Sequence, residues 1–218
     1  MIGEWLVEIS SEIIFRYTSL TSGMRILEIG PGLGIFADIC LKRNIEYYAV
    51  EPNQQMASAL EKKGIKVIRA IVPPLPEFKM TFDAVVMIQV LEHMDTMRDA
   101  IHITQQIWRV LKPGGKLIIS SPDYLNLRLN FFNCDFSHNY VTTHRRVKGL
   151  LINAGFSSFK HFYLSGPFSG FLCILISAVA SRLPFGILNA LFPDNEIFHR
   201  FYKLQLSFSR SILVIGTK

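Results

Sequence analysis

Three glycines at alternate positions, Gly30, Gly32 and Gly34, follow a short apolar run that contains the acid Glu28. Glycine has no Cβ, so a ligand can approach its backbone closely, and it also permits a positive φ. A helix expected over residues 35–43 would point its first N–H groups at a ligand on these glycines, which favours a carboxylate or a phosphate. The spacing therefore predicts a binding turn for a nucleotide-type ligand.

Two residues that follow the glycine turn, Ile35 and Glu51, narrow the choice of ligand. The dinucleotide fingerprint needs a small residue at its sixth position, where helix and strand pack closely. Ile35 stands at that position and counts against a nicotinamide cofactor, which makes a dehydrogenase the weaker alternative. Glu51 closes the next apolar run, where an acid can accept hydrogen bonds from both hydroxyls of a ribose.

Two later motifs complete an ordered set. A buried apolar run at 82–90 leads into a Val-Leu-Glu-His sequence at 90–93, and a Leu-Lys-Pro-Gly-Gly turn follows at 111–115. With the glycine turn and Glu51, these motifs resemble the class I S-adenosylmethionine-dependent methyltransferases, particularly the small-molecule and quinone-type group. The resemblance covers residues 23–123. It implies S-adenosyl-L-methionine as the cofactor and S-adenosyl-L-homocysteine as the product.

The resemblance also implies a set of residues that bind the cofactor. Glu28 and the glycine turn, Pro31 included, would hold its methionine part, and Glu51 would bind its ribose. Pro52 and Met56 would flank the adenine, and Gln89 would offer its backbone carbonyl to the amino group. Ile71 stands where the family often has an aspartate that binds the adenine amino group, so either backbone at 70–72 recognises adenine or cofactor affinity is reduced.

Methyl transfer needs in-line positioning of the acceptor, and a base where the acceptor is a hydroxyl. Histidine has a suitable pKa at neutral pH. The candidate catalytic residues follow the fourth and fifth strands: His93, Asp135, His138 and His144. Alternative roles stay open, because His93 could be structural or face the cofactor, Asp135 could orient a histidine or bind substrate, and His144 could simply begin a helix capped by Thr142 and Thr143.

Other chemistries lack their motifs. No cysteine follows a proline, as the cytosine-C5 methyltransferases require, and Ser121-Pro122-Asp123-Tyr124 is not the Asn-Pro-Pro-Tyr type of box that amino-methylating DNA enzymes carry. We expect no metal site, because the histidines are not spaced as ligands with cysteines or further histidines.

Alternating elements must position these residues. The expected strands cover residues 25–29, 47–50, 66–71, 82–88, 116–120, 159–163 and 211–216. The expected helices cover residues 2–17, 35–43, 53–63, 96–111 and 144–154. This alternation predicts an α/β, Rossmann-like, doubly wound fold with a mostly parallel seven-stranded sheet and helices on both faces. We also expect an apolar helical insertion before the last strand. Ligands then bind beyond the carboxyl ends of the strands.

Composition suits one domain of 218 residues, half of them apolar. We expect an N-terminal helix (1–20), a cofactor-binding core (21–163), an apolar and basic insertion (164–209) and a final strand (210–218). Three widely spaced cysteines and an N-terminus unlike a signal peptide predict a cytoplasmic protein. The net charge of +6 is concentrated after residue 138, with nine Lys or Arg against two acids.

The insertion begins with 18 uncharged residues, 164–181. It could cover the active site or contact another subunit, lie in a membrane interface, or span a bilayer, although its glycines and prolines disfavour one long helix. An apolar, basic segment suits a small or lipid-linked acceptor, with membrane-surface contact through 164–193. A protein of this kind would be a monomer or homodimer, and cytoplasmic or peripheral to the membrane.

Two alternatives for function remain open. Arg145, Arg146 and Lys148 could bind RNA, although the chain shows no separate RNA-binding module and nucleic acid is the less favoured partner. Ile71 leaves room for a catalytically silent scaffold that binds the cofactor.

Overall fold

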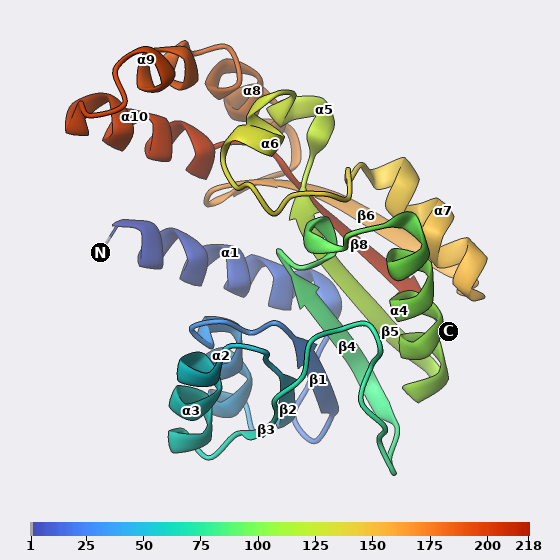
Figure 1. Cartoon of the computed structure of the whole chain (residues 1–218). Coiled ribbons are helices and arrows are strands. Elements are labelled where there is room, and N and C mark those ends of the chain that lie inside the picture. Colours follow the sequence, from blue (N-terminus) through green and yellow to red (C-terminus); the bar gives the residue numbers. More distant parts are fainter. Residues whose placement is uncertain (1) are drawn as a thin grey trace.

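A single mixed sheet forms the centre of the protein. The computed structural model describes residues 2–218 and the side chains from Trp5 onward, so Met1 and the side chains of Ile2 and Glu4 in the expected N-terminal helix lie outside the described residues. The strands are β1 (Arg25–Ile29), β2 (Glu46–Val50), β3 (Lys66–Ile68), β4 (Phe82–Ile88), β5 (Leu111–Pro122), β6 (Ser158–Ser165), β7 (Phe168–Ser169) and β8 (Ser211–Thr217). Their order in the sheet is β3-β2-β1-β4-β5-β8-β6-β7 (Figure 1).

The pairing of the strands confirms the predicted mostly parallel sheet. Strands β1 to β5 pair in parallel, whereas β8 lies antiparallel between β5 and β6. The sheet has eight strands where seven were expected, because β7 adds two residues that pair with Leu164 and Ser165. So short a strand, made by a tight Gly166-Pro167 turn, has no alternating pattern that a sequence could display.

The helices are α1 (Ile2–Thr18), α2 (Ile35–Lys42), α3 (Gln54–Lys62), α4 (Met97–Val110), α5 (Tyr124–Leu127), α6 (Asn130–Asn133), α7 (His144–Ala154), α8 (Gly170–Ala180), α9 (Phe185–Leu191) and α10 (Glu196–Ser207), with a 3-10 turn η1 (Leu91–His93). Those expected from periodicity are confirmed to within two residues. Side chains cap three of them, because Asn53, Thr96 and Thr143 each accept a hydrogen bond from a backbone N–H of the first turn.

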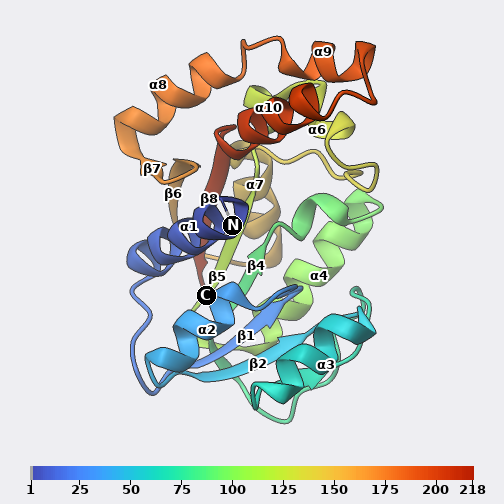
Figure 2. The same ribbon diagram turned by 90° about the vertical axis from the view of Figure 1, so that its left-hand side faces the viewer.

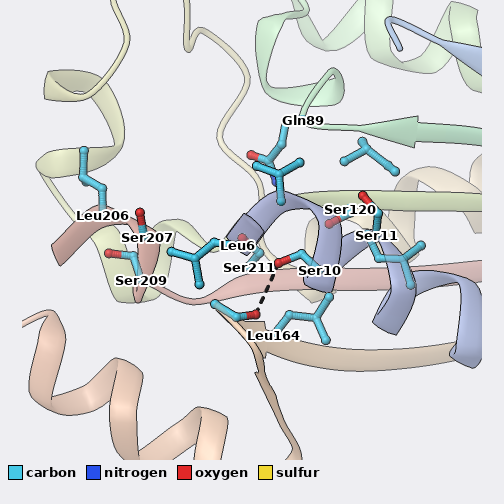
Figure 3. Close-up of a pocket in the computed structure, with 14 residues that line it drawn as sticks. Leu6, Ser10, Ser11, Gln89, Ser120, Leu164, Leu206, Ser207, Ser209 and Ser211 are labelled. Carbon is cyan, nitrogen blue, oxygen red and sulfur yellow. Dashed lines mark hydrogen bonds between the residues drawn. The ribbon is translucent and has the colours of Figure 1, made fainter. Parts of the chain in front are cut away.

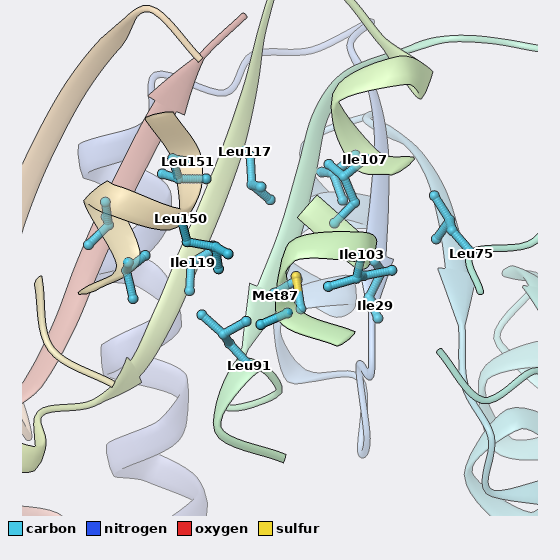
Figure 4. Packing of buried hydrophobic residues seen from close by; sticks show 14 of the residues in the cluster. Ile29, Leu75, Met87, Leu91, Ile103, Ile107, Leu117, Ile119, Leu150 and Leu151 are labelled. Carbon is cyan, nitrogen blue, oxygen red and sulfur yellow. The ribbon is translucent and has the colours of Figure 1, made fainter. Parts of the chain in front are cut away.

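Helices cover both faces of the sheet, as the doubly wound prediction requires. On one face, Ile103 and Ile107 of α4 and Leu150 of α7 pack with Met87 and Ile119 of the strands (Figure 4). On the other face, α1, α2 and α3 pack against the alternate side chains of the same strands. Because the central strands are buried on both faces, the carboxyl edge of the sheet is where polar ligands can reach it.

Two strand boundaries differ from the sequence-based expectation by three residues or more. β3 ends at Ile68 instead of residue 71, because its partner strand β2 ends at Val50, which pairs with Ile68. β5 begins at Leu111 instead of residue 116, because Leu111 already pairs with Phe82 before a register shift. The Lys-Pro-Gly-Gly segment is thus part of the strand.

The insertion before the last strand forms α8, α9 and α10, which lie together at one end of the molecule in both views (Figures 1 and 2). Gly170–Leu191 is long and apolar enough to cross a membrane by length and composition, and only 17% of its most apolar window is buried. However, the segment is two helices separated by residues 181–184, as its Pro184 led us to expect.

Candidate active site

The glycine turn joins β1 to α2 with three residues in the left-handed region. Gly30, Gly32 and Gly34 have φ of +67°, +56° and +76°. A Cβ on Gly30 would lie 2.7 Å from Val90, and one on Gly34 would lie 2.5 Å from Leu60. A Cβ on Gly32 would meet no atom within 4 Å. Gly30 and Gly34 therefore serve packing, whereas Gly32 faces open space that a ligand can fill.

Glu51 connects the glycine turn to the start of α3, two segments that are expected to bind the cofactor. Its buried carboxylate accepts hydrogen bonds from Gly32 N at 3.1 Å and from Asn53 N at 2.9 Å. One oxygen therefore steadies the glycine turn and the other steadies the start of α3. These bonds fix the position of an acceptor-only group at the carboxyl edge of β2, where it suits a ribose diol.

Glu28 has a different environment. Its buried carboxyl accepts a hydrogen bond from the hydroxyl of Tyr47, and burial raises its pKa to about 8 despite that bond. The pKa of Tyr47 is also raised, chiefly by burial, so the phenol remains a donor. Glu28 supports the strand beneath the turn, and its contact with the methionine part of a cofactor stays a prediction.

The remaining expected cofactor residues lie at the same edge. Pro52, Met56 and Ile71 are exposed, so their apolar atoms are available to an adenine ring. Gln89 follows β4 with a φ of +54°, and its N–H donates to the carbonyl of Ser120 at 2.8 Å. A positive φ is unfavourable for a residue other than glycine and is held here by the adjoining strand. Their roles in binding stay predictions.

Two of the expected catalytic histidines meet in the structure. His93 lies in η1 after β4, and His138 lies in the loop between α6 and α7, with their ring centroids 5.0 Å apart. The loop is fastened to η1 because Asn139 N and Tyr140 N both donate to the carbonyl of Glu92. Residues far apart in the sequence thus form one polar group.

Hydrogen bonds orient both rings. The Nδ1 atom of His138 lies 2.6 Å from the Phe131 carbonyl, which can only accept, so Nδ1 carries the proton and Nε2 has a free lone pair. Burial lowers the pKa of His138, which favours the neutral ring. The Nδ1 atom of His93 lies 2.8 Å from Ser137 Oγ, which donates to Asp135 at 2.6 Å. Asp135 is thus linked to His93 through Ser137, which is compatible with the expected role of orienting a histidine, and that role stays a prediction.

Glu92 joins this group, and we did not single it out from the sequence. Its side chain is fully buried, Oε2 accepts from Ser121 Oγ at 2.5 Å, and Oε1 has no hydrogen-bond partner among the described residues. Burial raises its pKa to about 7. Only its place beside His93 in the Val-Leu-Glu-His sequence could have drawn attention to it.

His144 lies among different partners. It begins α7, where Thr143 supplies the cap as expected, and its Nδ1 lies 2.7 Å from the hydroxyl of Tyr163. Its ring stacks on His161 with centroids 5.0 Å apart. The structure thus brings together His93, Asp135 and His138 and gives His144 its own set of contacts.

Two cavities meet at Gln89. One of about 240 Å³ lies between α1, the ends of β4 and β5, and the C-terminal part of α10, and serines line much of it (Figure 3). The other, of about 180 Å³, is lined by Gln89, Cys134 and His138. Ser209 and Ser211 line both cavities. The serines were missed in the sequence, because small polar residues near strand ends are too common to be distinctive.

Comparison with known proteins identifies the family. A family model described as a methyltransferase domain matches residues 6–159. An uncharacterised protein of Methanocaldococcus jannaschii is 40% identical over 97 residues, 44% of each chain. A ubiquinone biosynthesis O-methyltransferase of Xylella fastidiosa is 29% identical over 107 residues, 46% of this chain and 42% of that protein. The chain matches less than half the length of these relatives.

Solved structures share the fold at low sequence identity. A methyltransferase of Archaeoglobus fulgidus aligns with a TM-score of 0.67 and 22% identity, covering 97% of this chain and 94% of that one. Phosphoethanolamine N-methyltransferase 2 of Haemonchus contortus, solved with S-adenosyl-L-methionine, aligns with a TM-score of 0.68 and 16% identity over 96% of this chain and 52% of that one. With the family match over most of the chain and the glycine turn facing Glu51, the protein belongs to the S-adenosylmethionine-dependent methyltransferases.

Proposed function

We propose that this methyltransferase modifies an oxygen atom of a small acceptor that carries an apolar tail. The cavity of about 180 Å³ carries the proposal, because the same space is lined by Gln89 and by His138. Gln89 marks the strand end at which the cofactor is expected, and His138 offers a ring nitrogen with a free lone pair. An acceptor hydroxyl in this cavity would lie between the methyl donor and the histidine pair.

The chemistry asks for positioning and for removal of one proton. The oxygen–methyl bond forms as the carbon–sulfur bond of the sulfonium breaks, and the sulfur leaves with the bonding electrons as S-adenosylhomocysteine. The hydroxyl proton passes to the polar group formed by His138 and His93. Since Phe131 and Ser137 hold the two rings in place, little reorganisation is needed at the moment of transfer.

The helical insertion supplies a place for the tail. A cavity of about 440 Å³ between α8, α9 and α10 is lined almost entirely by apolar side chains, among them Val179, Leu183 and Phe201. α10 also contributes Leu206 to the two cavities at Gln89. One helix thus borders both the apolar space and the polar space, which suits a molecule with an apolar tail and a reactive head.

The helical insertion formed by α8, α9 and α10 also suits contact with an anionic membrane surface. α8 exposes Phe171, Leu172 and Leu175, and the exposed cations Arg182 and Lys203 lie in the same unit. An apolar face with flanking basic residues is typical of helices that lie in the membrane interface. We propose that a lipid-linked acceptor is presented from such a surface, with the protein peripheral to the membrane.

The test is turnover of S-adenosylmethionine to S-adenosylhomocysteine with aromatic hydroxyl acceptors, each supplied with and without an isoprenoid tail. We expect the tailed acceptors to give a lower KM. His138→Gln should lower kcat at least 100-fold without changing cofactor affinity, whereas His102→Gln, an exposed histidine of α4, should change neither. Equal kcat for His138→Gln and wild type, or turnover with RNA alone, would refute the proposal.

A further inference from the structure

Glu92, His93 and His138 form a set of metal-binding groups. Each residue offers one potential ligand atom, and these atoms lie within 4.8 Å of one another. Two imidazoles and one carboxylate are a common ligand set for divalent transition metals. His138 lies 45 residues after His93 in the sequence and joins the set from a separate loop. The sequence therefore shows no metal-ligand spacing, and it led us to expect no metal site.

The second polar atom of each side chain is already engaged. Nδ1 of His138 donates to the Phe131 carbonyl, and Nδ1 of His93 faces Ser137, which is bonded in turn to Asp135. Oε2 of Glu92 accepts from Ser121. Histidines that bind metals usually donate their other ring N–H to a carbonyl or to a carboxylate-linked group in this way. These bonds therefore leave one potential ligand atom of each residue unengaged.

The carboxylate supplies an independent observation. The side chain of Glu92 is fully buried, and its Oε1 atom has no hydrogen-bond partner within residues 5–218. An unpartnered carboxylate oxygen is costly in such a place. A cation bound beside it would satisfy the oxygen and also occupy the two free imidazole nitrogens.

We propose that Glu92, His93 and His138 bind one divalent first-row transition cation, of which Zn²⁺ and Mn²⁺ fit the ligand set. Metal–ligand bonds of about 2.1 Å place tetrahedral ligands about 3.4 Å apart, so side-chain movements of about 1 Å would close the site. Mg²⁺ suits the set less well, because it prefers an all-oxygen octahedral shell. Three protein ligands leave a coordination position open.

The open position deepens the proposed function and rests on it. His138 lines the cavity at Gln89, so an acceptor oxygen there can complete the coordination shell. A cation lowers the pKa of a bound hydroxyl, so the proton can leave to water without a protein base. This step would replace the proton transfer proposed for the metal-free site: with the cation bound, the two imidazoles would act as ligands instead of proton acceptors, and the methyl group would pass to the coordinated oxygen.

Metal binding is tested without acceptor or cofactor. Untagged, chelator-treated protein is titrated calorimetrically with Zn²⁺, Mn²⁺ and Mg²⁺, and Co²⁺ is added for its visible ligand-field absorption. We expect one equivalent of Zn²⁺ or Mn²⁺ to bind, and Mg²⁺ to bind at least tenfold more weakly. Glu92→Gln and His138→Gln should each weaken binding at least tenfold, and Ser137→Ala, which removes the partner of His93, should weaken it about tenfold.

The controls separate folding from binding. His102→Gln should bind like the wild type, and circular dichroism of every variant without metal checks that it is folded. Ser137→Ala and the Co²⁺ spectrum of the wild type keep the test valid if Glu92→Gln does not fold. A wild type that binds no cation at 1 mM, or a His93→Gln/His138→Gln double variant that binds as tightly, would overturn the site. Cation binding without turnover of any hydroxyl acceptor would instead refute the proposed function and leave the site standing.

Discussion

A hydrogen bond joins Glu51 and Gly32 at the carboxyl edge of the sheet. A carboxylate oxygen of Glu51, at the end of β2, accepts it from the N–H of Gly32, the central glycine of the β1–α2 turn, at 3.1 Å. The acid that is expected to bind the ribose therefore also sets the shape of the turn that is expected to hold the methionine part. Loss of the carboxylate should affect both halves of the cofactor site.

Glu51→Gln should weaken S-adenosylmethionine binding at least tenfold, because hydrogen bonds to a charged group contribute about 1.5–3 kcal/mol each. Calorimetric titration with the cofactor measures the change. Glu46→Gln is the matched control, since Glu46 begins β2, the strand after which Glu51 comes, but bonds to Arg25 and Tyr48 instead. If Glu51→Gln binds the cofactor as tightly as Glu46→Gln does, the ribose assignment is wrong.

Gly32→Ala should mainly lower cofactor affinity, whereas Gly34→Ala should mainly lower the Tm. The new Cβ at position 32 meets no protein atom, so this variant should fold with a modest loss of Tm while its cofactor affinity falls at least tenfold. The new Cβ at position 34 would lie 2.5 Å from Leu60, so that variant should lose several degrees more in Tm. Thermal unfolding and cofactor titration of both variants give the comparison, and the reverse pattern would contradict it.

Glu28 should make stability fall as pH rises. Its pKa is raised to about 8 in the folded protein from an ordinary value of 4.5, so the folded state retains a proton that the unfolded chain releases. The stabilisation is complete below pH 4.5 and is lost as pH rises to about 8 and beyond, by an amount on the order of several kcal/mol. Urea unfolding at pH 6 and pH 9 measures it.

Glu28→Gln is the control for that measurement. Its amide oxygen can still accept from Tyr47 but cannot ionise, so the free energy of unfolding should fall less between pH 6 and pH 9 than in the wild type. An identical fall in both proteins would show that Glu28 is not the titrating group.

The exposed apolar side chains of α8 should mediate binding to anionic vesicles. Replacing Phe171, Leu172 and Leu175 together by Gln should reduce co-sedimentation with phosphatidylglycerol vesicles at least tenfold, because each exposed side chain would otherwise enter the interface. Ile152→Gln changes an equally exposed residue of α7 and should have no effect. Unchanged binding by the α8 variant would remove the proposed membrane contact.

The sequence predicted the features that local chemistry determines. The glycine turn, the Thr143 cap and the apolar strands each depend on a few adjacent residues, and apart from the end of β3 and the start of β5 the boundaries in the structure lie within two residues of expectation. Elements too short for any periodicity were missed, such as β7, α5 and α6. The grouping of Glu92 with His138 was also missed, because it depends on how a loop after β5 folds back onto η1 through the bonds of Asn139 and Tyr140.

The position of β8 between β5 and β6 has a consequence for folding during synthesis. β6 is made before the insertion, yet its neighbour β8 is made after it, so β5 and β6 cannot be joined until residues 164–209 have been translated. During that interval one edge of β5 and one edge of β6 are unpaired beside newly made apolar helices, which is a state prone to aggregation. A chaperone that protects this late intermediate should therefore raise the yield of soluble protein, and slower translation of the insertion should lower it.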